Sequence, residues 1–172
     1  IRPSARDELD ITDAIQHLVD AGLEVRPHVV DGWWKDSGKL EDILEANRLI
    51  LDTIEPRIEG TVDDASRVEG KVIVSPGAII ERSVVRGPVV IGADARITHA
   101  YVGPFTAIGD RVELRDTEIE HSIVLEGARI TDLANRIEDS LIGRHVVISR
   151  LPVRPSAYRF MLGDNSEVSI RW

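Results

Sequence analysis

The residues best suited to binding or catalysis lie in the glycine-flanked segment GWWKDSG, residues 32–38. A carboxylate such as Asp36 can hold Mg²⁺, which keeps several waters and bridges to substrate phosphates. The indole of the neighbouring Trp34 can cover the face of a sugar. A structural interpretation competes with this one, in which Trp33 and Trp34 are core anchors and Asp36 caps the helix that follows. The residue types alone leave both interpretations open.

Three histidines farther along the chain are the other candidates for chemistry. A histidine base would suit acyl transfer, and His99, His121 and His145 all lie in the repetitive part of the sequence. Their repeat positions predict different corners or heights and no shared cluster. We therefore interpret them as exposed turn residues rather than as a catalytic group. The sequence also shows no long insertion that would hold a pantetheine arm.

An aliphatic residue returns every five or six positions from about residue 68 to residue 148. Three rows keep an interval of 17 residues: Val68, Val85, Val102 and Ile119; Val74, Ile91 and Ile108; Ile80, Ile97 and Leu114. The pattern continues less regularly through Val124, Ile130, Ile137, Ile142 and Ile148. Many positions four residues after the aliphatic one are small or apolar, among them Ala78, Val84, Ala95 and Val112. The spacing predicts a triangular parallel β-helix built from hexapeptides.

Shorter elements flank this repeat. A helix is predicted to begin near Asp10 or Thr12, with an apolar face that includes Leu18 and with Gly22 as its C′ residue. Residues 24–31 predict a β-branched strand. A second helix follows from Lys39 to the stop at Pro56, and we expect it to pack on the first coil. After the repeat, residues 160–170 predict a hairpin or strand that caps the solenoid.

The composition of the chain excludes several classes of function. A formal net charge of −9 argues against a nucleic-acid partner, which requires a basic face. The absence of cysteine excludes disulfides and thiol nucleophiles. No apolar run approaches the length of a membrane span, and no signal-peptide pattern is present, so we expect a cytoplasmic protein without membrane contact. Because the sequence starts at Ile1 without a methionine, we expect a fragment of a longer polypeptide.

Two segments, PSARDELDITDAIQHLVDAG and GWWKDSGKLEDILEANRLIL, precede the hexapeptide repeat. Together with the repeat they resemble the long form of the glucose-1-phosphate thymidylyltransferases over essentially the whole chain. The resemblance implies a mainly β fold, with a left-handed parallel β-helix after a small α/β remnant of the nucleotidyltransferase domain. It implies a division into residues 1–55 and residues 56–172, the second part carrying the C-terminal cap. Left-handed winding is an exception to the usual crossover rule, and the spacing does not show it.

The resemblance also implies roles for two residues. In that family the aspartate of the W-x-D-[ST]-G motif binds the catalytic magnesium, which implies this role for Asp36. The tryptophan two residues earlier lines the glucose-1-phosphate pocket, which implies substrate binding by Trp34. Asp7 and Asp10 depart from the family pattern, and we assign no role to either. The family's loop G-x-G-T-R-L-x-P and its first metal-binding aspartate are absent from these residues, so we assign no catalytic residue.

The function implied for the complete protein is the formation of dTDP-glucose and pyrophosphate from dTTP and glucose-1-phosphate, with Mg²⁺ as the cofactor. We expect the 172 residues alone to be inactive because the nucleotide loop is missing from them. Three alternatives remain at this point: a nucleotidyltransferase for another sugar or base, a hexapeptide-repeat acyltransferase, and a non-catalytic β-helix assembly module. The flat faces of a solenoid lead us to expect a homo-oligomer.

Overall fold

A computed structural model describes residues 11–29, 31, 39–150, 160, 162–163 and 166–170. The chain divides into two compact units, residues 1–34 and residues 35–172. The described part of the first unit contains helix α1 (Ile11–Asp20), and that of the second contains helix α2 (Leu40–Asp52) and the β-strands. Neither helix is long and apolar enough to cross a membrane, and this holds only for the described residues.

Helix α1 forms where the apolar spacing predicts it, and it ends at the predicted C′ glycine, Gly22. Gly22 has φ +72°, and its N–H donates to the carbonyl of Val19 at 3.0 Å. The N–H of Leu23 donates to the carbonyl of Leu18 at 3.1 Å. These two bonds form a Schellman motif with glycine at C′, so the predicted end of this helix is confirmed.

The predicted strand at residues 24–31 is wrong for the residues that the structure describes there. Residues 23–29 and 31 have no strand assignment, and Val25 and Val29 are exposed. A strand requires a neighbouring strand for its ladder hydrogen bonds, which β-branched residues do not supply by themselves. The high β-propensity of these residues alone therefore led to a wrong prediction of a strand.

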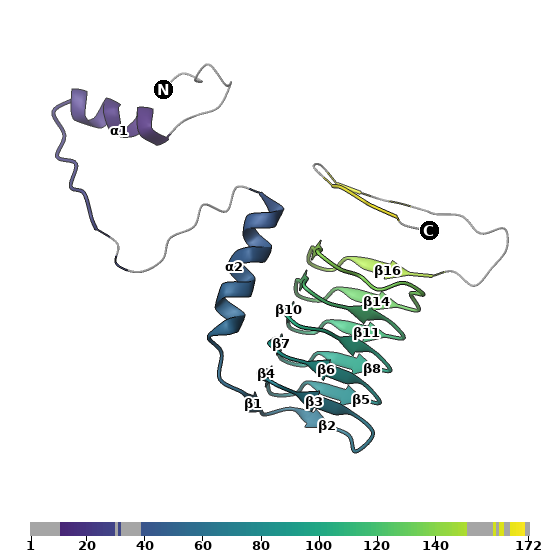
Figure 1. Ribbon diagram of the computed structural model, residues 1–172. Helices are drawn as coiled ribbons and strands as arrows, with labels where there is room; N and C mark the ends of the chain where they lie inside the picture. Colours follow the sequence, from purple (N-terminus) through teal and green to yellow (C-terminus); the bar gives the residue numbers. More distant parts are fainter. Residues whose placement is uncertain are drawn as a thin grey trace. The chain divides into compact units, whose positions relative to one another are not determined.

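The strands of the second unit form three parallel sheets, stacked coil upon coil (Figure 1). Sheet A contains β1 (Arg57–Ile58), β4 (Val72–Val74), β7 (Val89–Ile91), β10 (Thr106–Ile108), β13 (Ile123–Val124) and β15 (Leu141–Ile142). Sheet B contains β2 (Thr61–Val62), β5 (Ile79–Glu81), β8 (Arg96–Thr98), β11 (Glu113–Arg115), β14 (Arg129–Thr131) and β16 (Val147–Ser149). Sheet C contains β3 (Arg67–Glu69), β6 (Val84–Arg86), β9 (Tyr101–Val102) and β12 (Glu118–Ile119). The predicted mainly β solenoid is confirmed, and it is consistent with the left-handed β-helix that the resemblance implies.

The register of the sheets reproduces the periodicity of the sequence. Val72 pairs with Val89, which pairs with Thr106, and each step is one 17-residue coil. The aliphatic rows point inward, with Val85, Ile91 and Ile97 at 0% exposure. The less regular continuation also stays in register, because Ile119, Val124 and Ile130 face Ile137, Ile142 and Ile148 respectively. The core is therefore a stack of branched aliphatic side chains.

One predicted inward position, Val84, is corrected by the structure. The step from sheet B to sheet C takes five residues instead of six, so the small inward place falls one residue earlier. It is occupied by Ser83, Ala100 and Thr117 in successive coils, all of them buried. Val84 is only partly buried. Counting four residues from the aliphatic position therefore fails at this corner, where Ala134 is exposed as well, and Val146 at the corner between sheets A and B is also exposed.

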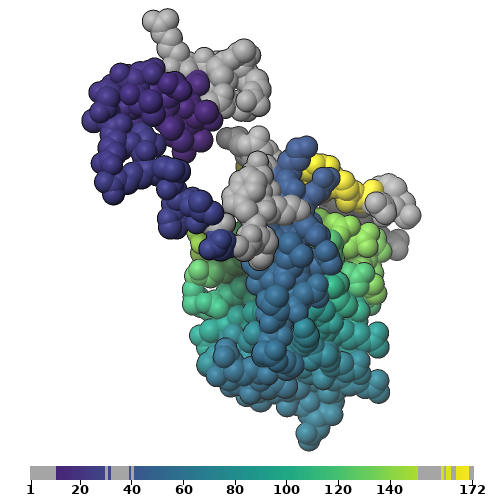
Figure 2. Space-filling model, turned by 60° about the vertical axis from the view of Figure 1, so that its left-hand side comes forward, coloured from purple at the N-terminus to yellow at the C-terminus, as the bar shows by residue number. Residues whose placement is uncertain are grey.

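Helix α2 packs along the solenoid through its buried Leu44 and Leu51, as Figure 2 shows. Asn47 Nδ2 donates to the carbonyl oxygen of Phe105 at 3.0 Å, and Lys71 Nζ donates to the carbonyl oxygen of Asp52 at 2.6 Å. Lys71 precedes β4 and Phe105 precedes β10, which are two coils apart. The helix was predicted to pack on the first coil, and its contacts extend along further coils.

The C-terminal segment is described only at residues 160, 162–163 and 166–170, and none of these is in a strand. The capping role assigned to this segment stays a prediction. The division at residues 55 and 56 also stays a prediction.

Candidate functional site

Trp34 and Asp36, the two predicted site residues, lie outside the described residues. Their substrate and magnesium roles stay predictions. Asp36 offers one carboxylate, which suits Mg²⁺ as part of a ligand set completed by waters and phosphates. Within the described ranges, no group of three or more His, Asp or Glu side chains is placed to hold a metal ion.

The alternative in which Asp36 caps the following helix stays a prediction, because Asp36 lies outside the described residues. The N-cap position of α2 belongs to Lys39, which has extended backbone angles of φ −122° and ψ 157°. No side-chain cap hydrogen bond is made there. Lys39 is not one of the residue types that favour an N-cap position.

The helix after this segment is held firmly by the solenoid. Besides the Asn47 contact, the Arg48 guanidinium lies 5.9 Å from the centre of the Phe105 ring. Arg48 also donates two hydrogen bonds of 2.8 Å to the carboxylate of Glu45, and this pairing raises the pKa of Arg48 above its ordinary value. The solenoid thus contacts α2, the first described helix after the predicted magnesium ligand.

The three histidines of the repeat lie at three different corners of the triangle. His99 lies between sheets B and C, His121 between sheets C and A, and His145 between sheets A and B. All three have positive φ, at +49°, +43° and +57°, a conformation in which histidine is enriched among non-glycine residues. Their interpretation as separate turn residues is confirmed.

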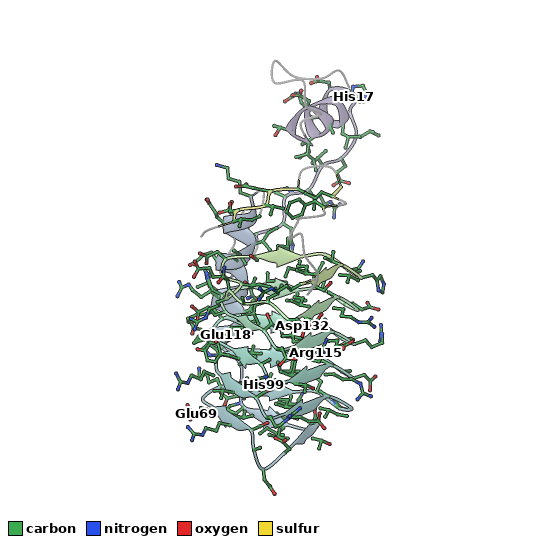
Figure 3. The ribbon with its side chains drawn as sticks, turned by 90° about the vertical axis from the view of Figure 1, so that its right-hand side faces the viewer. His17, Glu69, His99, Arg115, Glu118 and Asp132 are labelled. Carbon is green, nitrogen blue, oxygen red and sulfur yellow. The ribbon has the colours of Figure 1, made fainter. Side chains whose placement is uncertain are left out.

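His99 is nevertheless part of a polar row along the corner between sheets B and C. Its Nδ1 donates to Oδ1 of Asp116 at 2.5 Å, and this bond is the largest cause of a lowered pKa for the Asp116 carboxyl. Arg115 donates to Asp116 at 3.2 Å and to both oxygens of Asp132 at 3.1 and 2.8 Å. His99, Arg115 and Asp132 follow one another along the solenoid in Figure 3.

Sequence reasoning missed this row although a signal for it existed. His99 and Asp116 are 17 residues apart, which is the interval of the aliphatic rows. Residues separated by one coil stack directly on one another in a solenoid. Extending the period from the inward residues to the corner residues would have placed this histidine beside this carboxylate.

A second histidine–aspartate pair lies beside residues that hold α2 on the solenoid. His121 Nδ1 hydrogen bonds to Oδ1 of Asp139, and the Phe105 ring meets the His121 ring edge-on with 6.2 Å between centroids. Because Phe105 also contacts α2, this corner fastens the helix to the coils. We assign it no chemical role.

Comparisons with known proteins extend this picture. A family model described as nucleotidyl transferase matches residues 1–53. Glucose-1-phosphate thymidylyltransferases from Streptomyces griseus and Streptomyces antibioticus are 52% and 48% identical over 170 and 171 residues. A low-salt glycan biosynthesis nucleotidyltransferase from Haloferax volcanii is 43% identical over 173 residues.

Each of these three alignments covers 99% of this chain and 48% of the relative. The chain thus spans about half the length of the curated relatives that it matches. The predicted resemblance is confirmed: over nearly its whole length, this chain is similar to the glucose-1-phosphate thymidylyltransferases.

Proposed function

We propose that this chain is the C-terminal part of an enzyme that makes dTDP-glucose and pyrophosphate from dTTP and glucose-1-phosphate. The observation that carries the proposal is the identity of 52% and 48% to two glucose-1-phosphate thymidylyltransferases over 99% of this chain. The whole GWWKDSG segment falls inside these alignments. The 172 residues by themselves are proposed to be inactive, because they contain no G-x-G-T-R-L-x-P loop.

In the proposed reaction, a phosphate oxygen of glucose-1-phosphate attacks the α-phosphorus of dTTP. A new P–O bond forms as the bond to the β-phosphate breaks, and pyrophosphate leaves with the electron pair. Asp36 would hold Mg²⁺, which offsets negative charge at the reacting phosphates when it is bound. Trp34 would bind the glucose part of the substrate and orient it. The solenoid and α2 would give the GWWKDSG segment a fixed base.

The experiment is a pyrophosphate-release assay on the complete protein, including the region that precedes Ile1. Wild-type protein should release pyrophosphate from dTTP and glucose-1-phosphate only when Mg²⁺ is present. Asp36→Asn should lower turnover at least a hundredfold, because it removes the proposed ligand charge at the reacting phosphates. Asp31→Asn, a change of the same kind just before the segment, is the matched control and should keep full turnover.

Two results would count against this proposal. Equal turnover by the Asp36→Asn and Asp31→Asn proteins would remove Asp36 from the site. Faster turnover with another nucleotide or sugar phosphate would keep the reaction type and replace the substrates. Acyl transfer is not proposed, because the three solenoid histidines lie at three separate corners.

A further inference from the structure

The solenoid has an open end at its last coil. Strand β15 is the final strand of sheet A and β16 is the final strand of sheet B, and Figure 1 shows β16 at the end of the stack. The described residues supply no further strand beyond these two, so their outer backbone groups have no ladder partner there. An uncovered sheet edge is a template for pairing with another chain.

Val146 shows how this end differs from the rest of the solenoid. The register of β14 and β16 places it one coil after Ala128, in the inward row at the corner between sheets A and B. In the earlier coils the same place is at most 1% exposed, and it belongs to Ala78, Ala95, Val112 and Ala128. Val146, in contrast, is 37% exposed. Ile148 is only partly buried, although Ile130 in the preceding coil is 0% exposed. Core side chains thus reach the surface at this end.

The last described segment of the chain, residues 166–170, has apolar side chains that are also exposed. Val168 is 47% exposed and Ile170 is 40% exposed. These two residues alternate with Glu167 and Ser169. An extended chain with this alternation places its apolar side chains on one face and its polar side chains on the other. The segment therefore suits an apolar surface that is open on one side.

The charges of the two parts are complementary. Arg144 precedes β16 and Arg150 directly follows it, so both border the open end. Both arginines are exposed, and neither forms an ion pair with a described residue. The same holds for Glu167 of the segment. Because exposed ion pairs contribute little free energy, this complementarity orients the segment more than it stabilises it.

The connection along the chain favours this end of the solenoid over the other one. The first coil is open as well, because Ile58 is 56% exposed while its neighbour in the next coil, Val74, is 0% exposed. The segment, however, follows β16 in the sequence. To reach Ile58 it would have to run back past the six strands of sheet A, a distance of roughly 24 Å at about 4.8 Å between neighbouring strands.

We propose that residues 166–170 lie across the last coil of the same chain and cover its open end. Val168 and Ile170 pack on Val146 and Ile148, and the carboxylate of the segment faces the two arginines that border the end. The cover keeps the edges of β15 and β16 from pairing with another molecule. This contact lies within the second unit of the chain, and it does not rest on the proposed function.

The first test uses a pair of engineered cysteines, because the 172 residues contain none of their own. In the chain with Val146→Cys and Val168→Cys, mild oxidation should give an intramolecular disulfide, which requires Cβ atoms about 4 Å apart. The matched control combines Val168→Cys with Ile58→Cys at the other open end. This control should form its disulfide at least roughly tenfold more slowly, because its two Cβ atoms are not held within that distance. Mass spectrometry of the unreduced peptides measures both rates.

Three results of this experiment would overturn the proposal. Equal rates for the two pairs would show that the segment has no preferred place. Faster oxidation of the pair with Ile58→Cys would assign the segment to the first coil. Disulfides that form mainly between two molecules of the Val146→Cys, Val168→Cys chain would assign the cover to a second copy.

Amide hydrogen exchange of the last coil is an independent test. Val168→Asp places a charge on the covering face, and exchange in residues 141–149 should accelerate at least roughly tenfold, the effect of one valine that is no longer buried. Ser169→Asp adds the same charge to the opposite face and should leave the exchange unchanged. Equal exchange in the two variants would show that the segment does not cover the coil. Wild-type exchange that slows as the protein concentration rises would mean that a second copy covers it, which also contradicts the proposal.

Discussion

The solenoid and helix α1 both carry periodic apolar residues, but they differ in how far these residues are buried. In the coils the inward side chains are fully buried, as at Val85 and Ile97, which are 0% exposed. In α1 no residue is buried, and Leu18 on its apolar face is 41% exposed. Each coil covers the next one, so a repeat supplies its own partners. An isolated amphipathic helix does not, because most helical stability comes from tertiary packing of the apolar face. Four predictions test how far this difference extends.

The largest contrast should come from the same substitution in both units. Leu114 is 0% exposed and Leu18 is 41% exposed. Leu114→Ala should lower the free energy of unfolding by about 2–5 kcal/mol through lost burial and a cavity. Leu18→Ala should change it by less than about 0.5 kcal/mol. Urea unfolding of both variants measures the difference, and equal losses would show that α1 is packed as firmly as the coils.

A smaller loss is expected where two coils approach each other through a glycine. A Cβ at Gly92 would lie 2.5 Å from the carbonyl carbon of Gly109 and 2.6 Å from the nitrogen of Asp110. Gly92→Ala should therefore cost about 1–3 kcal/mol through overpacking. The control is Gly143→Ala, whose Cβ meets only Val146 Cγ2 at 3.5 Å. If the two variants unfold at the same urea concentration, the coils are less closely stacked than described.

The third prediction concerns the contact between α2 and the coils. Asn47→Ala removes the hydrogen bond to the Phe105 carbonyl, which contributes about 1 kcal/mol. Amide hydrogen exchange should accelerate across residues 40–52. Gln16→Ala removes only a local bond of 2.8 Å to Asp20 within α1 and is the control. Unchanged exchange in α2 would mean that Leu44 and Leu51 alone hold the helix.

The smallest effect should be a shift in acid sensitivity at the corner row. The pKa of Asp116 is lowered mainly by its hydrogen bond with His99, with Arg115 contributing. A carboxyl whose pKa is lowered by folding stabilises the fold above its unfolded pKa, and this contribution disappears as the pH falls through the folded value. In His99→Ala the pKa of Asp116 should rise towards its ordinary value, so this carboxyl contributes less stability above its unfolded pKa and less is lost on acidification.

NMR titration of the Asp116 carboxyl carbon in both proteins measures this shift. His145→Ala removes a turn histidine at another corner and should leave the titration of Asp116 where it is. An unchanged Asp116 pKa in His99→Ala would mean that Arg115 rather than His99 sets it.

Much of the fold was predictable because its determinants are local and periodic. The rows through Val74, Ile80 and Val85 specify three inward-facing sides, and Gly22 marks the end of α1. The strand predicted at residues 24–31 is not formed by the described residues, because a strand depends on a neighbour elsewhere in space. The same limit explains the wrong prediction that Val84 points inward. The step from sheet B to sheet C is one residue shorter than the others, so Ser83 is the buried residue there.

The sequence by itself determined the solenoid, the two helices and the motif that carries Asp36 and Trp34, since these depend on residue type and spacing along the chain. Only the tertiary structure decided which polar side chains meet. The pairing of His99 with Asp116 needs one coil to stack on the next, and the buried Thr117 hydroxyl has no hydrogen-bond partner among the described residues. Such features depend on contacts between distant residues, and the types of the individual residues do not reveal them.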